Sequence, residues 1–207
     1  MHYDKQDIAD WDRVFRLKVI NSVTGIKPAN LIGSATKEGA TNLAVFSSVV
    51  HLGSQPALLG LITRPQTDEV GHTLQNIIET GRYTINHIHP EFTQKAHYTS
   101  AKFDKAVSEF EACGLNEEYI EGFAAPFVKE SKFKIGMLFK ETIDLPNGTK
   151  FVIGEVEHLI LPDIDLNGGD IDLEASKSIG ISGLNSYYEL TKIAQHPFAR
   201  LGELPEF

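Results

Sequence analysis

The chain has 207 residues, of which 42% are hydrophobic and 23% charged, and this is enough apolar material for a sizeable core. Its net charge is −9 and its lysines and arginines are scattered, so the sequence argues against binding to nucleic acid. No apolar run approaches the ~20 residues that span a bilayer, and the N-terminus has no signal-peptide core, so we expect a cytoplasmic protein without membrane contact.

Runs of β-branched and apolar residues bounded by glycine and proline predict that most of the chain forms strands. The expected strands are a pair around a turn within residues 16–36, and single strands at 44–50, 57–63, 82–88, 133–143 and 150–161. The Asn147-Gly148 pair between the last two strands is a strong hairpin signal.

Short helices are predicted between these strands, at residues 73–81, 92–98 and 105–112, with Thr73 and Asp104 as N-terminal caps and Gly81 as the end of the first helix. We expect a helical turn and an extended stretch at 125–128 within residues 114–131, a polar loop around Gly168-Gly169, and a helix or turn over 183–194. The single cysteine, Cys113, excludes an intrachain disulfide and is interpreted as a small hydrophobic residue at a helix end.

Hairpin-linked strands with inserted helices favour a mainly β fold, an antiparallel barrel rather than a parallel sheet. The length suggests one domain over residues 1–207. Residues 162–207 would be a C-terminal extension that packs on the barrel or on a partner subunit.

The segment from Thr41 to Ser48 combines small and hydroxyl residues with strand formers. Two interpretations stay open for it. It could be a half-buried strand with two serines facing water, or a wall whose asparagine, serines and backbone groups hydrogen-bond a planar polar ligand.

A second polar feature follows at the end of the next predicted strand. Arg64 offers a planar donor fork suited to phosphate, and a helix that starts near Thr73 presents free N–H groups. The alternative is a surface arginine beside an ordinary capped helix. No GxxxxGK[ST] or GxGxxG sequence is present, so neither a P-loop nor a Rossmann site is predicted.

The histidines do not predict a metal site. His87 and His89 share one face of a predicted strand, but no third ligand follows at a recognisable spacing. His51 and His97 could neighbour a cofactor or could be ordinary residues at element ends. No Gly-x-Ser-x-Gly sequence is present, and the acidic residues are interpreted as a solvated shell.

Four ordered motifs resemble the flavin reductase-like family, whose fold is the FMN-binding split barrel of antiparallel Greek-key type. They are Thr41-Asn42-Leu43-Ala44-x-Phe46-Ser47-Ser48, Thr63-Arg64-Pro65, His72-Thr73-Leu74-x-Asn76-Ile77 and Thr84-Ile85-Asn86. The resemblance runs from about Val19 to Leu161. It continues at residues 183–188, where Asn185 stands in place of the Asp that relatives more often carry.

The resemblance implies that FMN lies at the interface of a homodimer. By position, the flavin ring and ribityl chain would be lined by Asn42, Ala44, Phe46, Ser47 and Ser48. The phosphate would be held by Thr63, Arg64, His72 and Thr73, and near it would lie Lys95, Ala96, His97 and Tyr98.

The resemblance further implies an NAD(P)H:flavin oxidoreductase in which NADH or NADPH reduces the flavin, which then passes electrons to an unknown acceptor. Because N5 of the flavin accepts the hydride, no catalytic side chain is required. Two alternatives stay open. The protein could carry electrons on FMN without NAD(P)H activity of its own, or the same barrel could hold another ligand such as haem or pyridoxal phosphate.

Overall fold

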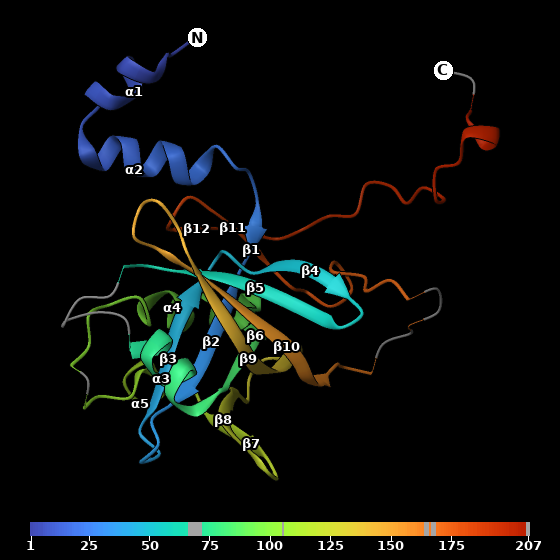
Figure 1. Cartoon of the computed structure of the whole chain (residues 1–207). Helices are drawn as coiled ribbons and strands as arrows, with labels where there is room; N and C mark the ends of the chain where they lie inside the picture. The colour runs from blue at the N-terminus through green and yellow to red at the C-terminus, as the bar shows by residue number, and fades with distance from the viewer. Residues whose placement is uncertain (66–71, 105, 164–165, 167–168, 206–207) are drawn as a thin grey trace.

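The computed structural model describes residues 1–65, 72–104, 106–163, 166 and 169–205 (Figure 1). Its centre is a seven-stranded antiparallel sheet in the order β3-β2-β6-β9-β10-β5-β4. The strands are β2 (Asn30–Ala35), β3 (Thr41–Phe46), β4 (Val50–Ser54), β5 (Ala57–Thr63), β6 (Arg82–His87), β9 (Lys134–Asp144) and β10 (Lys150–Ile160).

The sheet curls around one core and stays open along one seam. The inner core draws apolar side chains from β2, β5, β6, β9 and β10 and from α3 (His72–Thr80): Ile32, Leu61, Leu74, Ile77, Tyr83, Ile85, Met137 and Val152. The two edge strands, β3 and β4, follow each other in the chain but do not neighbour each other in the sheet. The result is a split barrel, and α3 carries the chain across it from β5 to β6 (Figure 1).

Two smaller sheets and several short helices surround the barrel. The strands are β1 (Lys27–Pro28), β11 (Gly180–Ser182) and β12 (Ser186–Tyr188) in one sheet, and β7 (Glu117–Ile120) and β8 (Phe123–Val128) in a hairpin. The helices are α1 (Lys5–Asp10), α2 (Arg13–Ser22), α4 (Thr93–Tyr98) and α5 (Glu109–Cys113), with 3-10 turns at Pro90–Phe92 and Leu201–Glu203.

A second core covers the outer face of β2 and β3. Leu31 and Leu43 point outward from these strands, against Ala96 of α4 and Phe110 of α5. Ile181 of β11 joins the same cluster, so part of the segment after residue 162 packs on the barrel of its own chain. Within the described residues, no helix is long and apolar enough to cross a membrane.

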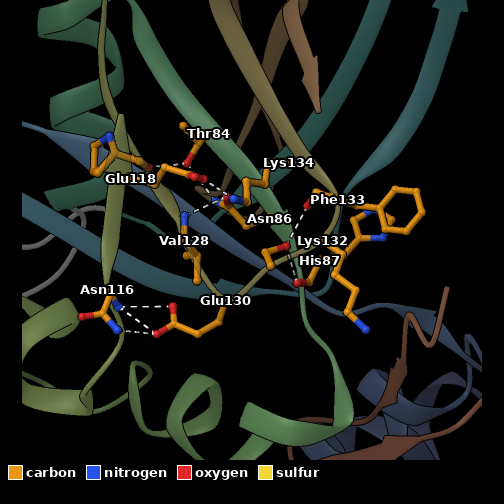
Figure 2. A network of polar contacts seen from close by, with 12 residues as sticks. Thr84, Asn86, His87, Asn116, Glu118, Val128, Glu130, Lys132, Phe133 and Lys134 are labelled. Carbon is orange, nitrogen blue, oxygen red and sulfur yellow. Dashed lines mark hydrogen bonds and ion pairs between the residues drawn. The ribbon is translucent and has the colours of Figure 1, made fainter. Parts of the chain in front are cut away.

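Strand β8 crosses the outside of the barrel and is held there by two buried side chains of β6 (Figure 2). Asn86 accepts a hydrogen bond from the Val128 N–H at 3.0 Å and donates to the Leu31 carbonyl at 3.1 Å and the Thr84 hydroxyl at 2.8 Å. Thr84 in turn donates to the Pro126 carbonyl at 2.7 Å. The Thr84-Ile85-Asn86 motif therefore fastens one layer of the fold to another.

Glycine is required where β8 passes over β2. A Cβ atom at Gly33 would lie 2.2 Å from the Pro126 carbonyl oxygen and 2.5 Å from the Thr84 hydroxyl, closer than real Cβ contacts. Polar contacts continue beyond this crossing, where Lys134 pairs with Glu118 of β7 (Figure 2). The β7–β8 hairpin is thus bound through backbone, hydroxyl and charged groups together.

Most of the predicted elements are confirmed within one to three residues. The strands at 57–63, 82–88, 133–143 and 150–161 correspond to β5, β6, β9 and β10, and the helices at 73–81 and 92–98 correspond to α3 and α4. Gly81 ends α3 with a φ of 72°, and Gly148 turns the β9–β10 hairpin with a φ of 79°. The mainly β, antiparallel class is therefore confirmed.

The N-terminal part of the predicted strand pair is wrong. Residues 13–22 form α2, because the Asp12 side chain accepts hydrogen bonds from the Val14 and Phe15 N–H groups and starts a helix there. The β-branched residues of this segment favoured strand, but a local cap outweighs that weak preference. Only β1 and β2 remain of the pair.

Four other expectations need correction. The strand at 44–50 is two strands, because β3 ends at Phe46 and β4 begins at Val50. The helix at 105–112 is shorter: Asp104 caps a single turn, residue 105 lies outside the described residues, and α5 starts at Glu109. The helical turn expected after 114 is strand β7. Residues 183–194 contain the expected turn, at residues 183–185, but the strand that follows it, β12, was not predicted. Only Gly169 of the Gly168-Gly169 loop lies within the described residues.

Replacing Asn86 by alanine tests the anchoring of β8. Asn86→Ala leaves the buried Val128 N–H without its partner and removes the side-chain bond to the Leu31 carbonyl, so we expect a loss of roughly 1–3 kcal/mol in unfolding free energy, measured by urea denaturation. The control Asn116→Ala loses an exposed bond to Glu130 and should cost less than about 1 kcal/mol. Equal losses in the two variants would contradict the anchoring role.

Candidate functional site

One face of β3 carries three of the predicted ligand-binding residues in a row. Asn42, Ala44 and Phe46 alternate along the strand and therefore point to the same side. Phe46 packs against the inner core, Ala44 is half-buried and Asn42 is 8% exposed. Because β3 is an edge strand, this row lies beside the open seam of the barrel.

At the start of β3 the row ends in a buried polar cluster. The Asn42 amide donates to the Thr73 hydroxyl at 3.0 Å and to the Ser34 hydroxyl at 3.4 Å, and the Asn76 amide donates to Ser34 at 3.2 Å. Thr73 lies in the first turn of α3 beside His72. Its hydroxyl accepts the hydrogen bond from Asn42, whereas the sequence predicted that Thr73 would cap the helix. The pocket at this cluster is lined by Thr36, Ala40, Thr41, Asn42, His72, Asn76, Val107 and Glu109.

Glu109 is a buried carboxylate in this pocket, although sequence reasoning assigned the acidic residues to a solvated shell. It accepts a hydrogen bond from the Leu43 N–H at 2.9 Å and thereby satisfies the edge of β3. Burial raises the pKa of Glu109, and the hydrogen bond from the Leu43 N–H opposes part of that rise. No sequence signal separates it from the exposed acids, because a Glu in the first turn of a helix is usually at the surface.

Beyond the other end of β3, the Ser48 side chain binds the backbone of β5. Its hydroxyl accepts from the Ile62 N–H at 3.0 Å and donates to the Ile62 carbonyl at 3.1 Å, so the link between β3 and β4 lies next to the end of β5. The Ser48 hydroxyl is thus engaged with backbone groups. Ser47, beside it, is half-buried at the seam.

The cationic side chain predicted to bind phosphate is that of Arg64, two residues after Ile62. Thr63 is 4% exposed, and its hydroxyl lies 3.4 Å from the Lys150 carbonyl oxygen. Arg64 comes next and is exposed. Residues 66–71, which join Arg64 to His72, lie outside the described residues.

Helix α4 lies on the opposite face of β3 from Asn42, Ala44 and Phe46. Ala96 is fully buried there against Leu43, and the Lys95 amine donates to the Gly114 carbonyl at 2.6 Å. His97 lies 3.2 Å from the hydroxyl of Tyr187, a residue of the 183–188 motif, and Tyr98 is 58% exposed. Within one chain, therefore, Lys95–Tyr98 are separated from the β3 row by the strand itself, and their contact with a ligand stays a prediction.

The two histidines at the end of β6 are held by protein groups. His87 lies 3.0 Å from the Ser178 hydroxyl and stacks on Phe133, and burial lowers the pKa of His87 to about 4. His89 accepts from the Lys132 N–H at 3.0 Å through its Nε2 atom. Among the described residues, no three His, Cys, Asp or Glu side chains are grouped to hold a metal ion.

Substitution of Glu109 separates its two properties, hydrogen-bond acceptor and buried charge. Glu109→Ala leaves the Leu43 N–H without its partner and should cost about 1–3 kcal/mol in unfolding free energy. Glu109→Gln keeps an acceptor and should cost less.

The buried carboxyl of Glu109 should affect how the free energy of unfolding depends on pH, measured by urea denaturation between pH 4 and 8. A carboxyl with a raised pKa in the folded state contributes stability at low pH that is lost as pH rises through that pKa. Glu109→Gln should lack this part of the decline. A variant that declines as steeply as the wild type would contradict the buried charge.

Comparison with known proteins places this chain in a family. Residues 26–169 match the flavin reductase like domain. A crystal structure from Shewanella frigidimarina NCIMB 400, described as a flavin reductase with a split barrel domain, is 46% identical, with a TM-score of 0.91 over 96% of this chain and 100% of that one.

More distant proteins share the fold. Component B of nitrilotriacetate monooxygenase from Bacillus cereus is 20% identical, with a TM-score of 0.83 over 95% of this chain and 98% of that one. An uncharacterised protein of Aquifex aeolicus is 28% identical over 59% of this chain, a match that spans 62% of that protein's length. The flavin reductase like domain matches more than half of the chain, and the Shewanella protein shares its split barrel. This protein therefore belongs to the flavin reductase-like family.

Proposed function

We propose that this protein binds FMN along the seam between β3 and β4 and is an oxidoreductase that takes hydride from NADH or NADPH. The observation that carries the proposal is the row on β3, which leads from a polar cluster at Asn42 and Thr73 to the Ser48–Ile62 contact beside Arg64. A flavin ring with a ribityl chain and phosphate needs this kind of surface, apolar in its middle and polar at both ends.

The side chains present fit the parts of FMN. Ala44 and Phe46 offer an apolar wall, the Ser47 hydroxyl lies at the seam, and Arg64 supplies an exposed guanidinium for the phosphate. Glu109 would repel an anion placed deep in the pocket near His72. We therefore expect the FMN phosphate to lie near the start of α3, on the side that faces Arg64 and away from Glu109.

When bound, FMN would supply the atom that accepts hydride, and the chain's own residues would position it. Asn42 is fixed by Thr73 and Ser34, so its amide is preorganised and loses little entropy on binding a ligand. The backbone at Leu43 is fixed by Glu109. The protein thus contributes orientation and exclusion of water rather than an acid or base.

We further propose that the protein acts as a homodimer, with the second subunit closing the exposed side of the seam. The exposure of Arg64 and the half-burial of Ser47 support this, since a bound flavin would otherwise keep one side in water. A partner would also offer its own Lys95–Tyr98 segment, which lies behind β3 within one chain.

The first test is spectroscopic. Purified protein, saturated with FMN and desalted, should keep an oxidised-flavin absorption that bleaches under anaerobic NADH or NADPH. FMN that dithionite reduces but both nicotinamides leave oxidised would favour the electron carrier. Protein that retains no FMN would overturn the proposal, and mass analysis of any other ligand released on denaturation would then identify haem or pyridoxal phosphate.

The second test concerns the phosphate. Arg64→Ala should weaken FMN binding by about 1.5–3 kcal/mol, the range for a hydrogen bond to a charged group, while riboflavin binding stays unchanged. Both affinities can be measured by quenching of flavin fluorescence. The control Arg82→Ala removes the same charge from a surface pair with Glu157 and should leave both affinities as in the wild type. An equal loss for riboflavin in Arg64→Ala would make Arg64 a structural residue.

A further inference from the structure

Glu109 is a carboxylate that the fold holds inside the protein, at the open edge of β3. It belongs to α5, is 8% exposed and accepts the Leu43 N–H at 2.9 Å. Glutamate is almost never fully buried, because taking its charge out of water is costly. A buried carboxylate beside a candidate ligand site therefore invites the question of what it does to a ligand.

The position of Glu109 is fixed by the residues on either side of it in α5. Before it, the Ser108 hydroxyl lies 2.7 Å from the Thr41 hydroxyl, and Thr41 donates its own proton to Glu117 of β7 at 2.7 Å, so Ser108 is the donor to Thr41. After it, Phe110 is 2% exposed within the outer core. The carboxyl of Glu109 therefore cannot turn towards solvent without breaking contacts of α5 with β3 and with that core.

The carboxyl of Glu109 lines the same pocket as two residues of the candidate site. These are Asn42, in the row on β3, and His72, at the start of α3. Of the described residues that line this pocket, only Glu109 and His72 can carry a charge near neutral pH, because the others have hydroxyl, amide or apolar side chains. The carboxylate therefore determines the sign of the pocket's charge whenever His72 is neutral.

The titratable groups that face Glu109 come from three elements. Burial raises the pKa of Glu109, while hydrogen bonds from two backbone N–H groups and the charge of His72 in α3 oppose part of that rise. Burial also raises the pKa of the Cys113 thiol in α5, and the charge of Glu109 raises it further. Glu117 of β7 adds a second carboxylate, bound to another residue that lines the pocket. Two carboxylates thus face one imidazole.

A ligand with a phosphate dianion would meet this negative charge. In the proposed binding mode the FMN phosphate lies near the start of α3, where His72 lines the pocket together with Glu109. Like charges repel more strongly in a partly buried site than in bulk water, because water and salt screen them less there. A bound phosphate would therefore favour the uncharged form of Glu109, whereas riboflavin, which has no phosphate, would not.

We propose that Glu109 is a specificity-determining residue, which sets how strongly the site prefers FMN to riboflavin and couples binding of the phosphate to uptake of a proton by the pocket. Arg64 attracts the phosphate and Glu109 opposes it. The opposition is absent when Glu109 is protonated, so FMN affinity should fall as pH rises through the pKa of Glu109. The inference rests on the proposed function, because it needs FMN to bind, but it does not depend on the hydride step.

The test compares the affinities for FMN and riboflavin between pH 5.5 and 8, measured by quenching of flavin fluorescence. Glu109→Gln keeps an acceptor for the Leu43 N–H but removes the charge. At pH 8 this variant should bind FMN roughly 10-fold more tightly than the wild type and riboflavin equally well. At pH 5.5 the two proteins should approach the same FMN affinity. The phosphate of FMN titrates alike in both experiments, so the difference between the proteins reports on Glu109.

Glu111→Gln is the matched control. It makes the same charge change two residues further along α5, where the side chain is exposed. It should follow the wild type with both flavins at every pH. If Glu109→Gln loses the far-UV circular dichroism of the folded barrel, calorimetry of the wild type replaces it. At pH 7.5, titrations in two buffers of different ionisation enthalpy should show proton uptake with FMN and none with riboflavin.

Three results would overturn the inference. Equal tightening in Glu109→Gln and Glu111→Gln would assign the effect to net charge, and weaker FMN binding in Glu109→Gln would make the carboxylate favourable to the ligand or to the fold. FMN binding to the wild type without proton uptake would remove the coupling. Failure of the proposed function looks different, because the wild type would then bind neither flavin at any pH, and the inference would fall with it.

Discussion

The seam between β3 and β4 is the constraint on which the rest of this structure depends. A seven-stranded sheet curled around one core leaves two edge strands, and their unpaired backbone groups must be satisfied in other ways. Glu109 takes the Leu43 N–H of the edge strand β3, and Ser48 takes both backbone groups of Ile62, where β5 extends beyond its neighbour β4.

An open but well-defined seam is also what places polar chemistry beside an apolar wall. The row on β3 is rigid because its neighbours on β2 and α3 bind it, not because of the strand alone. Its charges are unevenly distributed, with a buried carboxylate at one end and an exposed guanidinium beyond the other. An anionic ligand would therefore have a preferred orientation along the seam.

The outer layer of the fold, like the inner core, buries the strands of the barrel. Strand β8 and the helices α4 and α5 cover the outside of β2, β3 and β6, so these strands are buried on both faces. Residues at the two ends of the described chain lack such cover: Val23 is 73% exposed, and Ile193 and Phe198 are 96% and 85% exposed.

Sequence patterns predicted the barrel strands well, since alternation and turn residues are local signals. They identified the Asn147-Gly148 turn and the end of α3 at Gly81, where a positive φ favours glycine. They failed at residues 13–22, where β-branched residues concealed a helix capped by Asp12. They also joined β3 to β4, because the break at Ser47–Val49 depends on a contact with β5 that is distant in sequence.

For the candidate site, the order of the motifs was enough to identify the family and to select Asn42, Arg64 and Thr73. The partners of each side chain were decided by the tertiary structure: Asn42 binds Thr73, Ser48 binds Ile62, and Glu109 is buried against Leu43. Sequence alone determined the strands β5, β6, β9 and β10 and the helices α3 and α4, because their signals are local. Only the folded chain decided which face of β3 each residue occupies and which polar groups remain free, because those depend on strands and helices brought together from far apart in the sequence.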